Sequence, residues 1–151
     1  MNPRPATVLG FDFGTKRIGI AVGQTLTASA RPLATVRTHN DEPDWEAIGR
    51  LIQSWRPAQL IVGLPTQADG GEHPLAATVR RFADELQRRY ALPVYLVDER
   101  LSSHAAAQIA VAAGGRAAPR SQAAKETVDR IAAQLILETW FSEQAHRRQP
   151  S

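Results

Sequence analysis

The first third of the chain alternates apolar and polar positions, the pattern typical of β-strands. This alternation predicts strands over Thr7–Phe13, Arg17–Gly23 and Ala30–Arg37. Because Gly14–Lys16 is short enough for a hairpin loop, we expect the first strands to be antiparallel. Farther along, "QLIVGLP" and "PVYLV" are continuous apolar runs, which are typical of strands buried in a parallel sheet.

After the third strand, apolar residues recur at helical spacing. They predict helices over residues 43–55 and 74–90, one from Ser102 or Ser103 to about 113, and one over about 123–141. The element order is therefore β-β-β-α-β-α-β-α-α. It predicts an α/β fold with a five-stranded mixed sheet, in which three antiparallel strands precede βα crossovers and helices flank the sheet. Ligands of such sheets usually lie at the carboxyl ends of the central strands.

The composition is that of an ordinary globular protein, with 151 residues, 43% hydrophobic and 22% charged. We expect one domain over 1–151, with residues 1–6 and 142–151 as flexible tails. No apolar run is long enough for a membrane helix and the start does not resemble a signal peptide, so a cytoplasmic protein is expected. The absence of cysteine excludes thiolate chemistry. The net charge is +3, with arginine as the main cation, which fits a polyanionic partner.

Several carboxylates occupy unusual positions. Asp12 lies in an apolar strand, Asp98 and Glu99 follow another, and Asp129 lies on the core-facing side of the last helix. Each has an ordinary alternative role, as a turn residue, a helix N-terminal charge or half of an ion pair. The predicted sheet nevertheless brings them toward one place. Carboxylates without nearby histidine or cysteine favour Mg²⁺ or Mn²⁺ over zinc.

Such a site is suited to phosphodiester hydrolysis. A divalent cation lowers the pKa of a bound water, and a second cation can stabilise the leaving oxygen. Arginines and lysines would hold the scissile strand. In this interpretation a cation balances Asp12, and Gly14 leaves room for a phosphate.

Four motifs follow one another along the chain: "DFGTKRIGIAV", "IVGLPTQADG", "VDERLSS" and "VDRIAAQLIL". In this order they resemble the YqgF (RuvX) family of RNase H-like proteins, over about Val8 to Phe141. The resemblance implies an RNase H-like fold, similar to that of RuvC-type Holliday junction resolvases. It also implies a nuclease that processes the 5′ end of pre-16S rRNA in ribosome biogenesis, with resolution of DNA junctions as the alternative.

Carried over by position, the resemblance implies Asp12, Glu99 and Asp129 as the catalytic and metal-binding acids. Adjacent residues of a strand point to opposite faces, so either Asp98 or Glu99 can be the ligand; we favour Glu99. Cations near these acids are the predicted nucleic-acid contacts: Lys16, Arg17, Arg100, Arg116, Arg120 and Lys125.

Two differences from the resolvases leave the number of metal ions open. Those enzymes carry a glutamate on the strand that corresponds to "QLIVGLP", and another acid where this chain has Ala132. A non-catalytic nucleic-acid-binding module for ribosome assembly is therefore an alternative function. An actin-like ATPase is disfavoured, because those proteins enclose the nucleotide between two such domains. The expected partner is structured RNA or a DNA junction rather than a membrane, and the protein is expected to be a monomer or a homodimer.

Overall fold

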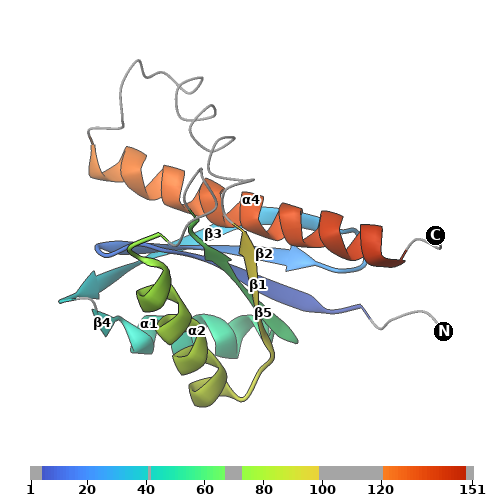
Figure 1. The fold of residues 1–151 in the computed structure, drawn as a ribbon, viewed down its shortest axis with the longest axis horizontal. Coiled ribbons are helices and arrows are strands. Elements are labelled where there is room, and N and C mark those ends of the chain that lie inside the picture. Colours follow the sequence, from blue (N-terminus) through green and yellow to red (C-terminus); the bar gives the residue numbers. More distant parts are fainter. Residues whose placement is uncertain (1–4, 41, 67–72, 99–120, 149–151) are drawn as a thin grey trace.

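The computed structural model describes residues 5–40, 42–66, 73–98 and 121–148. Over these residues a six-stranded sheet has the strand order β4-β3-β2-β1-β5-β6. Figure 1 shows this sheet with helices on both sides. The helix predicted up to about residue 113 lies outside the described residues. So do four predicted site residues: Glu99, Arg100, Arg116 and Arg120.

The strands form the mixed sheet that the sequence predicts. β1 (Thr7–Phe13) pairs antiparallel with β2 (Arg17–Gln24), and β2 pairs antiparallel with β3 (Ser29–His39). On the other side of β1, β5 (Gln59–Leu64) and then β6 (Val94–Asp98) add in parallel. The sixth strand is absent from the prediction. It is β4, two residues that pair with the end of β3, and so short a strand has no alternation to detect.

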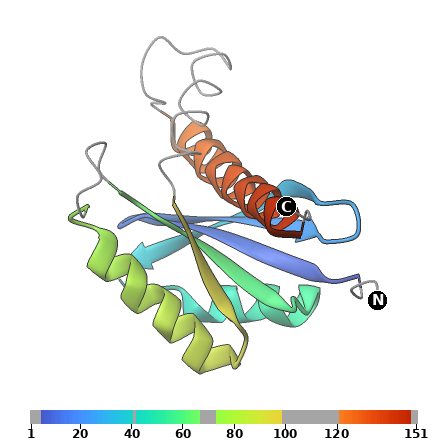
Figure 2. The ribbon, with the colours of Figure 1, turned by 45° about the vertical axis from the view of Figure 1, so that its right-hand side comes forward.

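Among the described residues, three helices cover the two faces of the sheet. Figures 1 and 2 show α1 (Trp45–Trp55) and α2 (Ala76–Tyr90) on one face and α4 (Gln122–Arg148) on the other. The Asp44 carboxylate caps α1 by accepting a hydrogen bond from the Ala47 amide at 3.1 Å. α4 continues to Arg148, beyond the end near Phe141 that the apolar pattern predicts, and so includes part of the expected tail.

Alternation along β1 separates two hydrophobic cores. Leu9, Phe11 and Phe13 pack into the core beneath α1 and α2, where Phe82 contacts the rings of Phe11 and Phe13. Val8 packs into the other core, beneath α4. The sheet is therefore buried on both faces, and the even-numbered residues of β1 face α4. Asp12 is one of them.

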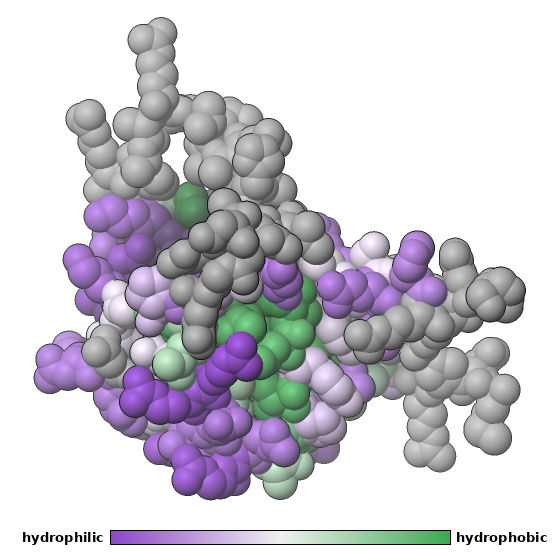
Figure 3. All heavy atoms as spheres, in the orientation of Figure 1, coloured by the Kyte–Doolittle hydropathy of each residue, from purple (hydrophilic) through white to green (hydrophobic). Residues whose placement is uncertain are grey.

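β6 is one edge strand of the described sheet, and it carries two of the exposed large apolar side chains. Tyr95 is 44% exposed and Leu96 is 40% exposed. On the face of the molecule seen in Figure 3, apolar surface gathers where β5 and β6 run. The described helices include none with the length and apolar character needed to cross a membrane.

Leu137→Ala should destabilise the fold by about 2–5 kcal/mol, because it leaves a cavity beneath α4. Leu137 is fully buried in the core on this face. Urea unfolding followed by circular dichroism measures the change. The exposed neighbour Glu138, replaced by Ala, is the matched control and should stay within about 0.5 kcal/mol of the original protein. Equal midpoints for the two variants would contradict this account of the core.

Candidate active site

Asp12 lies in a row of three residues that crosses the sheet beneath α4. Its Cα partner on β2 is Gly19, and the Cα partner of Gly19 on β3 is Thr35. Cross-strand partners share a face, and Ala21, two residues from Gly19, packs in the core beneath α4. The row therefore faces α4, with Asp12 near the carboxyl end of β1.

The backbone of α4 touches the sheet at Gly19. A Cβ atom built on Gly19 would lie 1.9 Å from the carbonyl oxygen of Asp129 and 3.0 Å from its Cα. No other residue type fits at this place without displacing the helix. The contact makes Asp129 a neighbour of Gly19 from above, just as Asp12 is its neighbour along the sheet. The fold thus brings together two of the three predicted acids.

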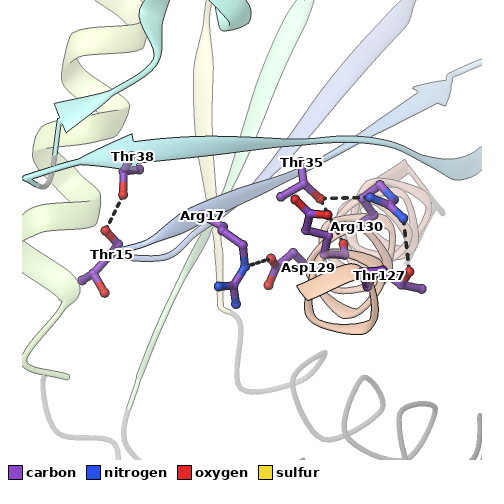
Figure 4. A network of polar contacts seen from close by, with 9 residues as sticks. Thr15, Arg17, Thr35, Thr38, Thr127, Asp129 and Arg130 are labelled. Atoms are coloured by element: carbon purple, nitrogen blue, oxygen red, sulfur yellow. Dashed lines mark hydrogen bonds and ion pairs between the residues drawn. The ribbon is translucent and has the colours of Figure 1, made fainter. Parts of the chain in front are cut away.

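Arg17, the first residue of β2, forms an ion pair with Asp129. Its Nε donates to Asp129 Oδ2 at 2.6 Å, and the two side chains are only 20% and 18% exposed. Figure 4 shows the Arg17 side chain extending from β2 with its Nε beside Asp129. A charge-assisted hydrogen bond of this kind orients the carboxylate strongly. The structure therefore places Arg17, a predicted nucleic-acid contact, against Asp129, a predicted acid of the site.

Thr35 fastens the beginning of α4 to β3. Its hydroxyl donates to the carbonyl oxygen of Glu126 at 3.0 Å and accepts from Arg130 Nη1 at 3.2 Å. Arg130 Nη2 also donates to the Thr127 hydroxyl at 3.2 Å (Figure 4). These bonds lie on the same stretch of helix as Asp129. They fix the rotation of α4 about its own axis, and so the direction in which Asp129 projects.

Asp98 lies on the other side of the sheet. Within β6, Val97 packs in the core beneath α4, whereas Val94 packs in the core beneath α1 and α2. By alternation Asp98 shares the face of Val94. Its carboxylate accepts a hydrogen bond from the Thr66 hydroxyl at 2.8 Å. Asp98 therefore does not share the face of Asp12 and Asp129, and the choice of Glu99 as the third acid stays a prediction.

The turn between β1 and β2 carries Lys16. Lys16 is exposed, and its carbonyl oxygen accepts from the Thr38 amide at 3.1 Å, which ties the turn to β3. A Cβ on Gly14 would lie 2.6 Å from the Arg17 carbonyl oxygen, so the turn itself accounts for this glycine. Lys125, in the first turn of α4, is half-buried. The contact of Lys16 and Lys125 with nucleic acid stays a prediction.

Three residues of this region are not among the site residues predicted from the sequence: Gly19, Thr35 and Arg37. A glycine inside a strand signals a close approach of backbone, and Gly19 carries that signal within "RIGIAV". Thr35 and Arg37 carry no such signal, because only the pairing of β3 with β2 shows where they lie. Arg37 is the Cα partner of Arg17 and is exposed, so a second cation lies beside the ion pair.

The donor set suits a hard divalent cation. Among the described residues no cluster of three histidine, cysteine, aspartate or glutamate side chains can hold a metal ion. They do place Asp12 of β1 and Asp129 of α4 on either side of Gly19, and Mg²⁺ is commonly bound by one or two carboxylates and several waters. These two residues therefore fit Mg²⁺ or Mn²⁺, with Glu99 as the predicted further ligand.

The arrangement of sheet and helices is similar to that of solved resolvases. A RuvC from T. thermophilus, solved with a Holliday junction substrate, matches with a TM-score of 0.54 and 21% identity, covering 97% of this chain and 99% of that one. The fowlpox virus Holliday junction resolvase matches with a TM-score of 0.50 and 15% identity, covering 92% and 99%. The fold is thus the RNase H-like fold of the resolvases.

The chain is more similar in sequence to several named relatives than to these solved structures. A protein of Dechloromonas aromatica named "Putative pre-16S rRNA nuclease" is 47% identical, over 93% of this chain and 93% of its own length. One of Legionella pneumophila with the same name is 50% identical, over 89% and 94%. The family model described as "RuvX: Holliday junction resolvase" matches residues 6–143. The chain belongs to the RuvX family, as the four motifs predict.

A double-mutant cycle on Arg17→Ala and Asp129→Ala should give a favourable coupling of about 1 kcal/mol or more, because the pair is largely shielded from water. Urea unfolding of the four proteins measures it. The i,i+4 pair of Glu46 and Arg50 is the control, since its side chains are 82% and 66% exposed. Its coupling should be about 0.3–0.5 kcal/mol. A coupling at Arg17 no larger than this would contradict the geometry.

Proposed function

We propose that the chain is a metal-dependent nuclease that hydrolyses phosphodiester bonds in structured RNA, cutting precursor 16S rRNA at its 5′ end. The observation that carries the proposal is the seating of Asp129 of α4 over Gly19, beside Asp12 of β1. The names of the relatives support RNA as the substrate. Ribosome biogenesis would place the protein in the cytoplasm.

In this proposal Asp12 and Asp129, with Glu99, would hold Mg²⁺ or Mn²⁺. The ion would supply Lewis-acid stabilisation of the scissile phosphate and acidify a water. Arg17 orients Asp129 through one carboxylate oxygen, in the manner of an outer-shell partner of a metal ligand. Water adds to phosphorus and gives up one proton, the bond to the leaving oxygen breaks, and that oxygen takes up one proton, so the step balances.

Exposed cationic side chains near the candidate site would hold the substrate. Lys16 in the β1–β2 turn and Arg37, the Cα partner of Arg17, are exposed and would contact the phosphodiester backbone of an RNA that reaches Asp12. Contacts of this kind fix the position of a nucleic acid without reading its sequence. They therefore suit RNA and DNA alike.

Cleavage of four-way DNA junctions is the second candidate function. It is favoured by the description of the family and by the RuvC solved with its junction substrate. Symmetric cutting of a junction needs a two-fold homodimer, whereas RNA processing suits a monomer as well. Both candidates use the same acids and differ in substrate.

Asp129→Asn should lower cleavage at least about 100-fold, because outer-shell changes alone cost 10–100-fold at metal sites. Labelled precursor 16S rRNA and a four-way DNA junction are incubated with Mn²⁺, Mg²⁺ or EDTA, and the products are resolved on gels. Glu138→Gln is the matched control, because it removes one exposed carboxylate from the same helix and should retain full activity.

The substrate that is cut decides between RNA and junction. Equal activity of the original protein and Asp129→Asn would contradict the proposed site. If neither substrate is cut while binding persists in EDTA, the protein is the non-catalytic module.

Lys16→Ala should weaken substrate binding at low salt and reduce the slope of log K against log salt by about 1, because one phosphate contact is lost. Fluorescence anisotropy with a labelled RNA, in EDTA over a range of salt concentrations, measures the slope. Arg50→Ala is the control: Arg50 lies on α1 and pairs with Glu46. The proposal for Lys16 fails if both variants give the slope of the original protein.

A further inference from the structure

We propose that Gly19 is a positioning residue for Asp129: the missing side chain at this point of β2 sets the height of α4 above the sheet, and with it the place of the helical carboxylate beside Asp12. The metal-binding consequence rests on the proposed function. The geometric consequence, the placement of Asp129 against Arg17, does not.

Three glycines beneath α4 show why Gly19 is special. A Cβ on Gly23 would meet the Phe141 ring at 3.0 Å, and one on Gly10 would meet the Leu137 side chain at 2.5 Å. The nearest backbone oxygens, those of Ala133 for Gly10 and Ser29 for Gly23, lie farther off, at 3.2 and 3.1 Å, so the shortest contact at both places is to a side chain. A Cβ on Gly19 would meet the main chain of Asp129 at 1.9 Å, whereas real Cβ contacts are essentially never below 3.0 Å. Only a separation of the main chains of α4 and β2 relieves this clash.

The required movement bears directly on the site. Raising 1.9 Å to 3.0 Å moves the carbonyl of Asp129 by roughly 1 Å, and misplacement on this scale can reduce catalysis by about 100-fold. Asp12 stays where the β1 ladder holds it, so the spacing of the two acids changes. The ion pair with Arg17, at 2.6 Å, would be strained at the same time.

Thr35 holds the helix down from the other side of Gly19. It is the Cα partner of Gly19 on β3, and its hydroxyl binds the Glu126 carbonyl and accepts from Arg130. Gly19 therefore permits the close approach, and Thr35 retains it. Thr35→Val keeps the shape of the side chain and removes both bonds, so it tests the same placement without a clash.

The experiment compares Gly19→Ala, Thr35→Val and the matched control Gly23→Ala, which adds the same methyl group on the same strand beneath the same helix. One readout is Mn²⁺ binding without substrate, measured by electron paramagnetic resonance. The other is the NMR signal of the Arg17 Nε–H, assigned by its loss in Arg17→Lys, which reports the ion pair with no metal present. Circular dichroism verifies folding.

Gly19→Ala should weaken Mn²⁺ binding about tenfold or more and shift or abolish the Arg17 signal, while Gly23→Ala changes neither. Unchanged Mn²⁺ binding and an unchanged Arg17 signal in folded Gly19→Ala would overturn the inference. Should Gly19→Ala fail to fold, Thr35→Val decides by the same two readouts. If the original protein binds no Mn²⁺ and cuts nothing, the nuclease proposal fails, and the Arg17 signal alone then supports or overturns the role of Gly19.

Discussion

A sheet buried on both faces is the constraint on which the rest of this structure depends. Alternation leaves each residue of β1 one of two destinations, and both are covered by helices. Leu9, Phe11 and Phe13 enter one core, and Val8 enters the other. Asp12 must then lie beneath α4, where a carboxylate needs polar company. The candidate site forms where Asp12, on the covered face of β1, lies near Asp129 of α4.

Most of the fold is accessible to sequence reasoning because its elements have strong periodic signals. The β1–β2 hairpin follows from a short link, and β5 and β6 follow from continuous apolar runs. The exceptions have physical reasons. β4 is two residues long and is defined only by its partner strand. α4 extends past its apolar stripe to Arg148, since a helix already docked can continue on propensity alone.

The site is less accessible, because its contacts join residues that are remote in the chain. Asp12 and Asp129 can be singled out as acids in apolar surroundings. The partner of Asp129 cannot, because Arg17 is 112 positions away. Likewise nothing local distinguishes Asp98 from its neighbour, and only the packing of Val94 and Val97 in different cores assigns its face. Register and helix docking supply what periodicity lacks.

The separation of Asp12 and Asp129 along the chain also has a consequence for biosynthesis. β1 and β2 leave the ribosome before α4 does, yet the ion pair of Arg17 with Asp129 and the cover over Asp12 both require α4. Domains fold as the chain emerges, but the core that α4 forms with this face of the sheet cannot close until α4 arrives. Asp12 and Asp129 therefore come together only after α4 has been synthesised, and a chain that stops before α4 carries no such pair of acids.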